Sequence, residues 1–249
     1  MDTSRVLRKN IKEWFYVISC FILVCCFLFQ PFKIPSGSMV PTLLVGDFLI
    51  VNKFCYGYSN ESFRIGTFTF PLPKMAKRLF AHKLPQRGEV VVFRNGRDRD
   101  QNYIKRVVGL PGDKIQIING VLHINDTPVE LREAGEYSAI DRNEYIVFKK
   151  YIEKLPNGYE HVIVKRFDFG QATLDNVGPF FVPDEHYFMM GDNRDNSQDS
   201  RVMEAVGFVP LNYIMGRAEC LFFSSSCSLY EVFKWPFSIR FERLFSVIT

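Results

Sequence analysis

The most continuous hydrophobic stretch of the chain lies near its N-terminus. Residues Trp14 to Phe29 are apolar except for Ser19, and Pro31 and Phe32 extend the stretch. As a helix it is about 28 Å long, close to the ~30 Å hydrocarbon core of a bilayer. We therefore predict a transmembrane anchor over residues 14–32. A cleavable secretory signal peptide has a similar pattern, but its apolar part is shorter and ends at an Ala-x-Ala-like site.

The segment before this stretch is basic. Residues 1–13 contain Arg5, Arg8, Lys9 and Lys12. Cytoplasmic flanks of membrane spans are enriched in such residues. We therefore predict that residues 1–13 are cytoplasmic and that residues 33–249 are exported.

Beyond residue 33, apolar positions mostly alternate with polar ones, which is the period of a half-buried strand. Asn119-Gly120 lies between two of these runs and predicts a hairpin turn. Helical patterns are weak and are confined to Met75–Ala81 and Leu131–Tyr137. The predicted strands are Asp47–Phe54, Glu89–Phe93, Tyr103–Val108, Lys114–Ile118, Val121–Ile124, Tyr145–Tyr151, His161–Phe167, His186–Met190 and Ile214–Phe223.

These patterns predict a mostly β fold: one antiparallel β-sheet domain, residues 33–249, anchored by one N-terminal transmembrane helix. Residues 126–180 are less regular and more polar, which makes them a candidate inserted lobe. Residues 63–73 and 232–245 are rich in Phe. They fit either packed protein interior or a surface that enters the headgroup region of a membrane.

Composition excludes several classes of function. The chain has 31 Lys and Arg against 27 Asp and Glu, which is too even to indicate a nucleic-acid partner. Six cysteines in 249 residues do not make a disulfide scaffold, and whether Cys220 and Cys227 pair is left open. The four histidines are far apart, so we expect neither a metal nor another cofactor.

Three segments combine serine, glycine and charged residues in unusual ways. The first holds Ser36-Gly37-Ser38, directly after the apolar stretch; the second places Lys105 among apolar neighbours, where burial lowers a lysine pKa. Strand periodicity turns Arg106 to the opposite face, toward solvent or an acidic partner. The third, residues 191–201, is dense in Asp and Asn. It departs from a calcium-binding loop, because position six of the loop holds Gln198 instead of glycine.

Four segments, in this order, resemble the conserved boxes of bacterial type I signal peptidases. They are SGSMVPTL at 36–43, RGEVVVF at 87–93, YIKRVVGLPGD at 103–113 and GDNRDNSQDSR at 191–201. The resemblance spans roughly residues 14–125 and 181–225, and Asn102 stands where many relatives carry Asp. It implies a membrane-bound serine endopeptidase that removes signal peptides from exported preproteins after a small-x-small site.

The resemblance also implies a role for each matching residue. Ser38 is the expected nucleophile and Lys105 the general base, while Ser36 and the Ser38 amide form the oxyanion hole. Ser197 is expected to orient the lysine amine, with Asp199 and Arg201 as a supporting ion pair. The expected substrate-binding residues are Phe32, Ile34, Pro35, Leu43, Leu49, Tyr103 and Ile104.

The implied partners are signal peptides of preproteins and membrane phospholipid. The implied location is the cell inner membrane, with a single span, a cytoplasmic N-terminus and a periplasmic catalytic domain. We expect a functional monomer, because one copy contains every expected catalytic group. The alternatives are another Ser-Lys dyad peptidase, such as a self-cleaving repressor or a conjugal-transfer peptidase, and a membrane-tethered β-rich binding protein without activity.

Overall fold

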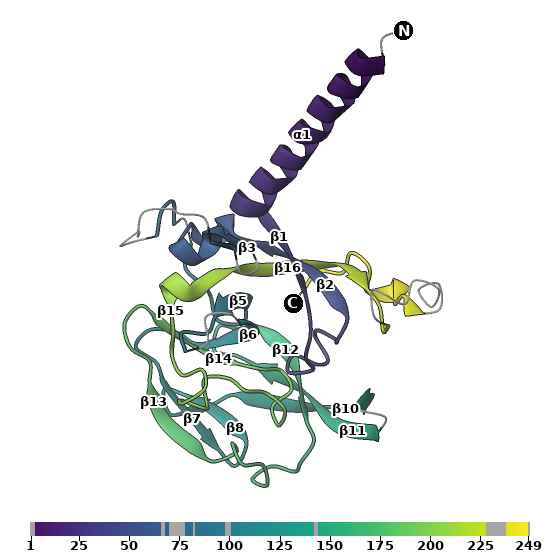
Figure 1. The fold of residues 1–249 in the computed structure, drawn as a ribbon. Helices are drawn as coiled ribbons and strands as arrows, with labels where there is room; N and C mark the ends of the chain where they lie inside the picture. Colours follow the sequence, from purple (N-terminus) through teal and green to yellow (C-terminus); the bar gives the residue numbers. More distant parts are fainter. Residues whose placement is uncertain are drawn as a thin grey trace.

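A long helix, α1 (Thr3–Phe27), projects from a body of antiparallel sheets in the computed structural model (Figure 1). The structure describes residues 3–65, 68–69, 78–81, 83–97, 101–141, 144–227 and 238–248. The strands are β1 (Phe29–Lys33), β2 (Asp47–Asn52), β3 (Arg64–Ile65), β4 (Phe68–Thr69), β5 (Val90–Arg94), β6 (Asn102–Gly109), β7 (Lys114–Ile118), β8 (Val121–Ile124), β9 (Thr127–Pro128), β10 (Glu130–Asp141), β11 (Glu144–Lys154), β12 (Glu160–Lys165), β13 (Val177–Phe181), β14 (His186–Met190), β15 (Val209–Pro210) and β16 (Ile214–Ser224). Short 3-10 helices are η1 (Phe54–Tyr56), η2 (Asn60–Phe63), η3 (Leu211–Tyr213) and η5 (Phe241–Arg243).

The central sheet has the strand order β1-β2-β16-β5-β6-β14-β15, and its neighbouring strands are antiparallel. Three smaller sheets follow the orders β13-β7-β8-β9, β10-β11-β12 and β3-β4. The prediction of a mostly β, antiparallel fold is confirmed. Asn119 and Gly120, between β7 and β8, have positive φ angles of 48° and 76°, as the predicted hairpin turn requires.

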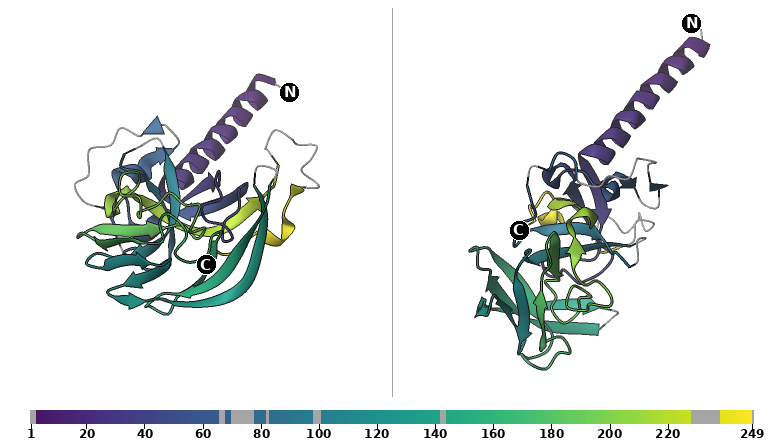
Figure 2. Two further views of the ribbon diagram at one scale, coloured as in Figure 1. Left: turned by 90° about the horizontal axis from the view of Figure 1, so that it is seen from below. Right: turned by 90° about the vertical axis from the view of Figure 1, so that its left-hand side faces the viewer.

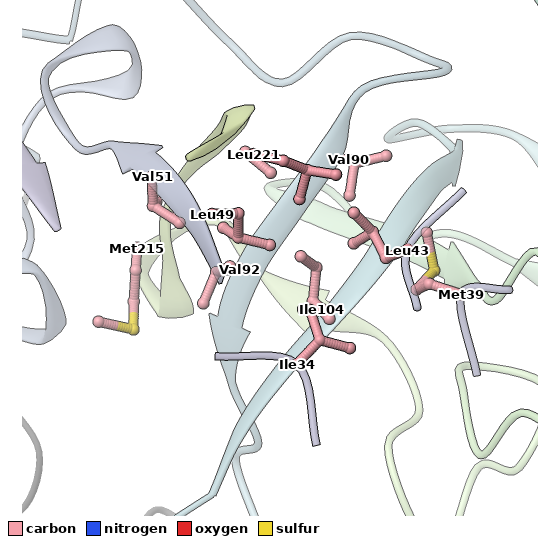
Figure 3. Close-up of a cluster of buried hydrophobic side chains, with 11 residues drawn as sticks. Ile34, Met39, Leu43, Leu49, Val51, Val90, Val92, Ile104, Met215 and Leu221 are labelled. Atoms are coloured by element: carbon pink, nitrogen blue, oxygen red, sulfur yellow. The ribbon is translucent and has the colours of Figure 1, made fainter. Parts of the chain in front are cut away.

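The main hydrophobic cluster lies against the central sheet and reaches the segment between β1 and β2 (Figure 3). In β2 buried and half-buried positions alternate, so one face of the strand supplies the cluster. Each fully buried aliphatic side chain contributes about 1.5–3 kcal/mol of transfer free energy. The cluster consists of Ile34, Met39, Leu43, Leu49, Val51, Val90, Val92, Ile104, Met215, Ala218 and Leu221.

The N-terminal helix ends earlier than the predicted anchor. Helix α1 stops at Phe27, and Phe29–Lys33 form edge strand β1, in which Pro31 lies opposite Ile50 of β2. Proline lacks an N–H group and its ring clashes with the preceding helical turn, whereas the edge of a sheet accommodates it. Within the described part of the chain, no helix combines the length and the hydropathy that a membrane crossing requires.

The other differences concern short segments. Leu131–Tyr137 belong to strand β10 and are not helical, because Gly135, at φ 88°, sits in a bulge opposite β11. Residues 66–67, 70–77 and 232–237 lie outside the described residues, and with them about half of the two Phe-rich segments and the start of the helical pattern at 75–81. Leu79 forms an isolated bridge with Tyr58 and is not in a helix. Cys220 and Cys227 are free thiols.

Candidate active site

Ser38 and Lys105 meet beside the central sheet. Ser38 lies in the turn that joins β1 to β2, and Lys105 lies on β6, opposite Val91 of β5. The Lys105 Nζ donates a hydrogen bond to Ser38 Oγ at 2.5 Å and another to the Ile104 carbonyl at 3.0 Å. An amine and a hydroxyl at this distance can exchange a proton directly.

The surroundings of Lys105 favour the neutral amine. The residue is 3% exposed, and among the described residues no carboxylate lies within ion-pair distance of its Nζ. Burial lowers the pKa of Lys105 to about 8, although the charges of Asp199 and Asp192 oppose this. The Arg201 charge lowers the pKa further. A substantial part of the lysine is therefore neutral near physiological pH.

Asn193 holds the turn that carries Ser38. Its N–H donates to the Ser38 carbonyl at 3.1 Å, and its Nδ2 donates to the Gly37 carbonyl at 3.1 Å. Ser36 Oγ lies 3.5 Å from Ser38 Oγ. Within the described chain, the Ser38 N–H donates to no backbone carbonyl. The sequence analysis gave Asn193 no role of its own, although it lies in the 191–201 segment that follows β14.

The residues after β14 surround the lysine from the other side. A Cβ added to Gly191 would lie 2.2 Å from Ser197 Oγ and 2.5 Å from the Ser38 carbonyl oxygen, so only glycine fits there. Ser197 Oγ is buried beside Asp199 and makes no hydrogen bond to Lys105 Nζ. The Ser38 turn and the Ser197 turn therefore touch through Gly191.

Asp199 and Arg201 form the expected ion pair. Both Asp199 oxygens accept from the Arg201 guanidinium at 2.9 Å, and the pair is buried. Asp199 also accepts the Gly191 N–H at 3.0 Å, while Arg201 donates to the Arg194 carbonyl at 2.7 Å. The pair therefore fixes the backbone of this turn from both ends.

Arg106 faces away from Lys105, as strand periodicity predicts. It is fully buried and pairs with Asp192 through two hydrogen bonds of 2.8 and 2.7 Å, so its partner is acidic and not solvent. Thr42 Oγ1 donates to the same carboxylate at 2.5 Å, and Arg106 Nη1 donates to the Gly88 carbonyl at 2.7 Å. Burial opposes both charges, yet the pair raises the pKa of Arg106 and lowers that of Asp192.

The segment 126–180 supports the active-site turn. Strand β12 joins the turn through backbone bonds from Val164 N–H to the Asp192 carbonyl at 2.9 Å and from Arg194 N–H to the Val164 carbonyl at 3.0 Å. On β11, Glu153 accepts from the Arg194 guanidinium at 2.8 Å. Lys165 pairs with Asp175 and Asp195 at 2.7 Å each. No motif in this segment indicated these contacts.

His161 lies in the same buried cluster. Its Nε2 is 3.4 Å from the Glu153 carboxylate. Burial, followed by the Arg106 charge, lowers the pKa of His161 to about 4. The histidine is therefore neutral near pH 7. Among the described residues, no three His, Cys, Asp or Glu side chains converge as metal ligands.

A cavity of about 380 Å³ lies between β1 and β6, on one side of the Ser36–Ser38 turn. Leu43 and Leu49 do not line it. Both are fully buried in the hydrophobic cluster that also contains Ile34 and Ile104, so they support the cavity from within the core. The lining residues are Phe32, Lys33, Ile34, Pro35, Val92, Gln101, Asn102, Tyr103 and Ile104.

The chain matches the family model described as "Signal peptidase, peptidase S26" over residues 7–223. The chain belongs to this family. It is therefore a peptidase, and the match includes residues 126–180. The signal peptidase I of Rickettsia typhi is 38% identical over 98% of this chain and 94% of the relative, and that of Rickettsia prowazekii is 36% identical over 98% and 95%. A crystal structure of a signal peptidase I from Enterococcus faecalis V583 is 25% identical and covers 54% of this chain and 97% of that chain, with a TM-score of 0.31.

Proposed function

We propose that this protein removes signal peptides from exported preproteins by cutting after a small-x-small site, with Ser38 as nucleophile and Lys105 as general base. The 2.5 Å contact between Ser38 Oγ and a buried Lys105 amine without an ion-pair partner among the described residues carries this proposal. Membership in the signal peptidase family supplies the substrate class.

The dyad geometry supports acyl transfer. The neutral Lys105 amine takes the proton of Ser38 Oγ while this oxygen attacks the scissile carbonyl carbon. When the tetrahedral intermediate collapses, Lys105 returns the proton to the leaving amine, which becomes the N-terminus of the mature protein. A water molecule, deprotonated by Lys105, then hydrolyses the acyl-enzyme and releases the signal peptide as a carboxylic acid.

The turn at Ser36–Ser38 supplies the oxyanion hole in this proposal. The Ser38 N–H and the Ser36 hydroxyl stabilise the negative oxygen of the tetrahedral intermediate. Losing one such donor typically lowers the rate ~10²–10³-fold. Asn193 acts through the turn, because its two hydrogen bonds to Gly37 and Ser38 hold the backbone in place.

The cavity between β1 and β6 fits the residues before the scissile bond. Its walls include Ile34 and Pro35 on one side and Tyr103 and Ile104 on the other. An extended peptide beside these segments can add backbone hydrogen bonds, while shallow apolar pockets exclude large or charged side chains. This accounts for a requirement for small residues one and three positions before the cut.

The exposed apolar surface of α1 supports membrane attachment. The side chains of Trp14, Phe15, Tyr16 and Val17 are each more than half exposed, and consecutive helical positions point in all directions. The helix leads directly into β1, and the turn that carries Ser38 follows β1 (Figure 1). We therefore propose a monomer held in the cell inner membrane through residues 14–27, the apolar part of α1, with a cytoplasmic N-terminus and the catalytic domain, residues 33–249, on the periplasmic side among phospholipid headgroups.

The test is cleavage of a model preprotein in detergent by the wild type, Ser38→Ala and Lys105→Met. Methionine keeps most of the lysine volume and removes the amine. We expect cleavage after the small-x-small site by the wild type and a loss of ~10⁴–10⁶-fold in kcat/KM in both variants. Folding is checked by the thermal midpoint, Tm.

The matched control is Lys114→Met, which removes a partly exposed lysine on β7. This control should keep the wild-type rate. Turnover by Lys105→Met comparable to that of the control would show that Lys105 is not the base. A folded wild type that cleaves no preprotein would reject the activity itself.

A further inference from the structure

A second, larger cavity opens on the other side of the Ser36–Ser38 turn. It measures about 770 Å³ and shares Pro35 with the cavity between β1 and β6. Ser36 and Gly37 form one wall, and strands β10 and β11 form another through Tyr137, Ala139 and Phe148. The two cavities therefore meet at Pro35, next to the turn that carries Ser38.

The position of α1 sets the direction of a bound substrate. The smaller cavity is lined by Phe32 and Lys33, which follow the end of α1 closely, whereas β10 and β11 lie at the end of the body away from α1 (Figures 1 and 2). The apolar part of a signal peptide arrives from the membrane, on the α1 side. The residues after the scissile bond must then leave toward β10 and β11.

The lining of the larger cavity is part apolar and part polar. Val40 and Leu44 pack with the side chains of β10 and β11, and Asn193 and Asn196 add amide groups. Among the described lining residues, Arg240 is the only charged one. An extended peptide can thus pack on the apolar wall. A carboxylate of that peptide can bind at the polar end of the cavity, where the asparagines and Arg240 lie.

Arg240 is positioned to meet such a carboxylate. Its Nη1 donates to the Val45 carbonyl and to Ser224 Oγ, both at 3.1 Å, and lies 3.5 Å from Asp47. Asp47 is held more closely by Arg243, at 2.6 Å. Within the described chain, these contacts engage only Nη1, which leaves Nε and Nη2 for a ligand.

We propose that the larger cavity binds the first residues of the mature protein and favours an acidic residue over a basic one there. This inference rests on the proposed function, because it needs Ser38 to cut the chain between the two cavities. It adds a selectivity on the leaving-group side of the scissile bond, supplied by β10, β11 and Arg240.

The steric experiment uses the full-length protein in detergent and two substrates with the same signal peptide and cleavage site. One continues into a long mature segment, and the other ends as an amide one residue after the cut. Ala139→Trp fills the cavity, and Ser138→Trp, on the exposed face of β10, is the matched control. We expect Ala139→Trp to lower kcat/KM about tenfold for the long substrate, a difference of about 1.4 kcal/mol, and to leave the short one unchanged.

The charge experiment varies one residue early in the mature segment among Glu, Ala and Lys. The wild type should prefer Glu over Lys roughly two- to fivefold, the range expected for a partly exposed charge pair. Arg240→Glu should reverse this order. The Glu-to-Lys ratio is the readout, because a loss of the Arg240 contacts to Val45 and Ser224 would slow all three substrates alike.

The results separate this inference from the proposed function. Equal slowing of the long and short substrates by Ala139→Trp, or a Glu-to-Lys ratio unchanged by Arg240→Glu, would overturn the assignment of the cavity while cleavage itself stands. A wild type that cuts neither substrate would remove the proposed function and this inference with it.

Discussion

Lys105 and Arg106 are neighbours on β6, but the two faces of this strand give their charges opposite surroundings. Lys105 contacts Ser38 and has no ion-pair partner among the described residues, and burial lowers its pKa to about 8. Arg106 is buried as deeply, yet the two hydrogen bonds to Asp192 outweigh burial and raise its pKa. Burial alone therefore does not decide whether a cation keeps its proton.

The Lys105 side of β6 takes part in the proposed reaction, whereas the Arg106 side supports the structure of the site. In the proposed mechanism Lys105 must release its proton, and no carboxylate among the described residues lies within ion-pair distance of its amine. On the other side, charged groups hold the turn after β14: Asp192 accepts from Arg106 and Thr42, Arg194 pairs with Glu153 of β11, and Asp195 pairs with Lys165 of β12. In the proposed mechanism, strand β6 therefore positions both the base, Lys105, and the charged groups that hold the turn carrying Ser38.

Removing the partner on the charged face should have the largest effect on stability. Arg106→Met leaves the fully buried Asp192 without its cation, and breaking a buried pair in this way typically costs about 3–5 kcal/mol. We expect the urea midpoint to fall accordingly. Lys105→Met, which removes an unpaired and desolvated cation, should leave the midpoint unchanged or raise it.

The double variant Arg106→Met with Asp192→Leu sharpens this prediction. It replaces both charges by apolar side chains, so it should be less destabilised than the sum of the two single variants. If Arg106→Met unfolds at the wild-type urea concentration, the contrast between the two faces of β6 has no energetic basis.

The sequence predicts one of these faces better than the other. The strand runs around β6 and the four boxes indicate Ser38 and Lys105, and the structure brings these two into contact. Periodicity places Arg106 on the opposite face but does not identify Asp192, because the pairing depends on how β14 aligns with β6. Glu153 and Lys165 come from a segment without any motif, so only the tertiary structure reveals that they support the active-site turn.

The sequence also predicts only part of the fold. Alternating runs predict most of the central sheet. Most of β1 falls within the predicted anchor, because Phe29, Pro31 and Phe32 continue the apolar stretch, although Pro31 suits the edge of a sheet better than a helix. Leu43 and Leu49 have side chains of the kind that lines apolar pockets, yet both are buried in the core. Apolar character predicts burial, and it does not distinguish a pocket wall from the layer behind it.

A smaller effect is expected from His161, the neutral residue on the charged face. Its pKa is about 4 in the folded protein and 6.5 in an unfolded chain. Between these values the unfolded chain binds more protons, so stability falls as the pH drops from about 6.5 to about 4, by up to about 3 kcal/mol. His161→Gln should flatten this part of the profile of urea midpoint against pH.

His123→Gln, on β8, is the control for this measurement and should keep the wild-type slope. Glu153 adds acid sensitivity only below its ordinary pKa of 4.5, since Arg194 lowers its pKa in spite of burial. A His161→Gln variant that loses stability from pH 6.5 downward as steeply as the wild type would show that another group causes the acid sensitivity.

The smallest expected effect tests the base directly. Because only neutral Lys105 can accept the Ser38 proton, kcat/KM should rise with pH and level off above about 8. Asp199 is the charge that raises the Lys105 pKa most, so Asp199→Asn should shift this rise to lower pH by several tenths of a unit, and the remaining Arg201 charge acts in the same direction. Asp113→Asn, a carboxylate paired with Arg87 outside the site, should leave the profile in place. A rise that stays in place or moves to higher pH in Asp199→Asn would show that the titrating group is not Lys105, because removal of this negative charge favours the neutral form of the lysine.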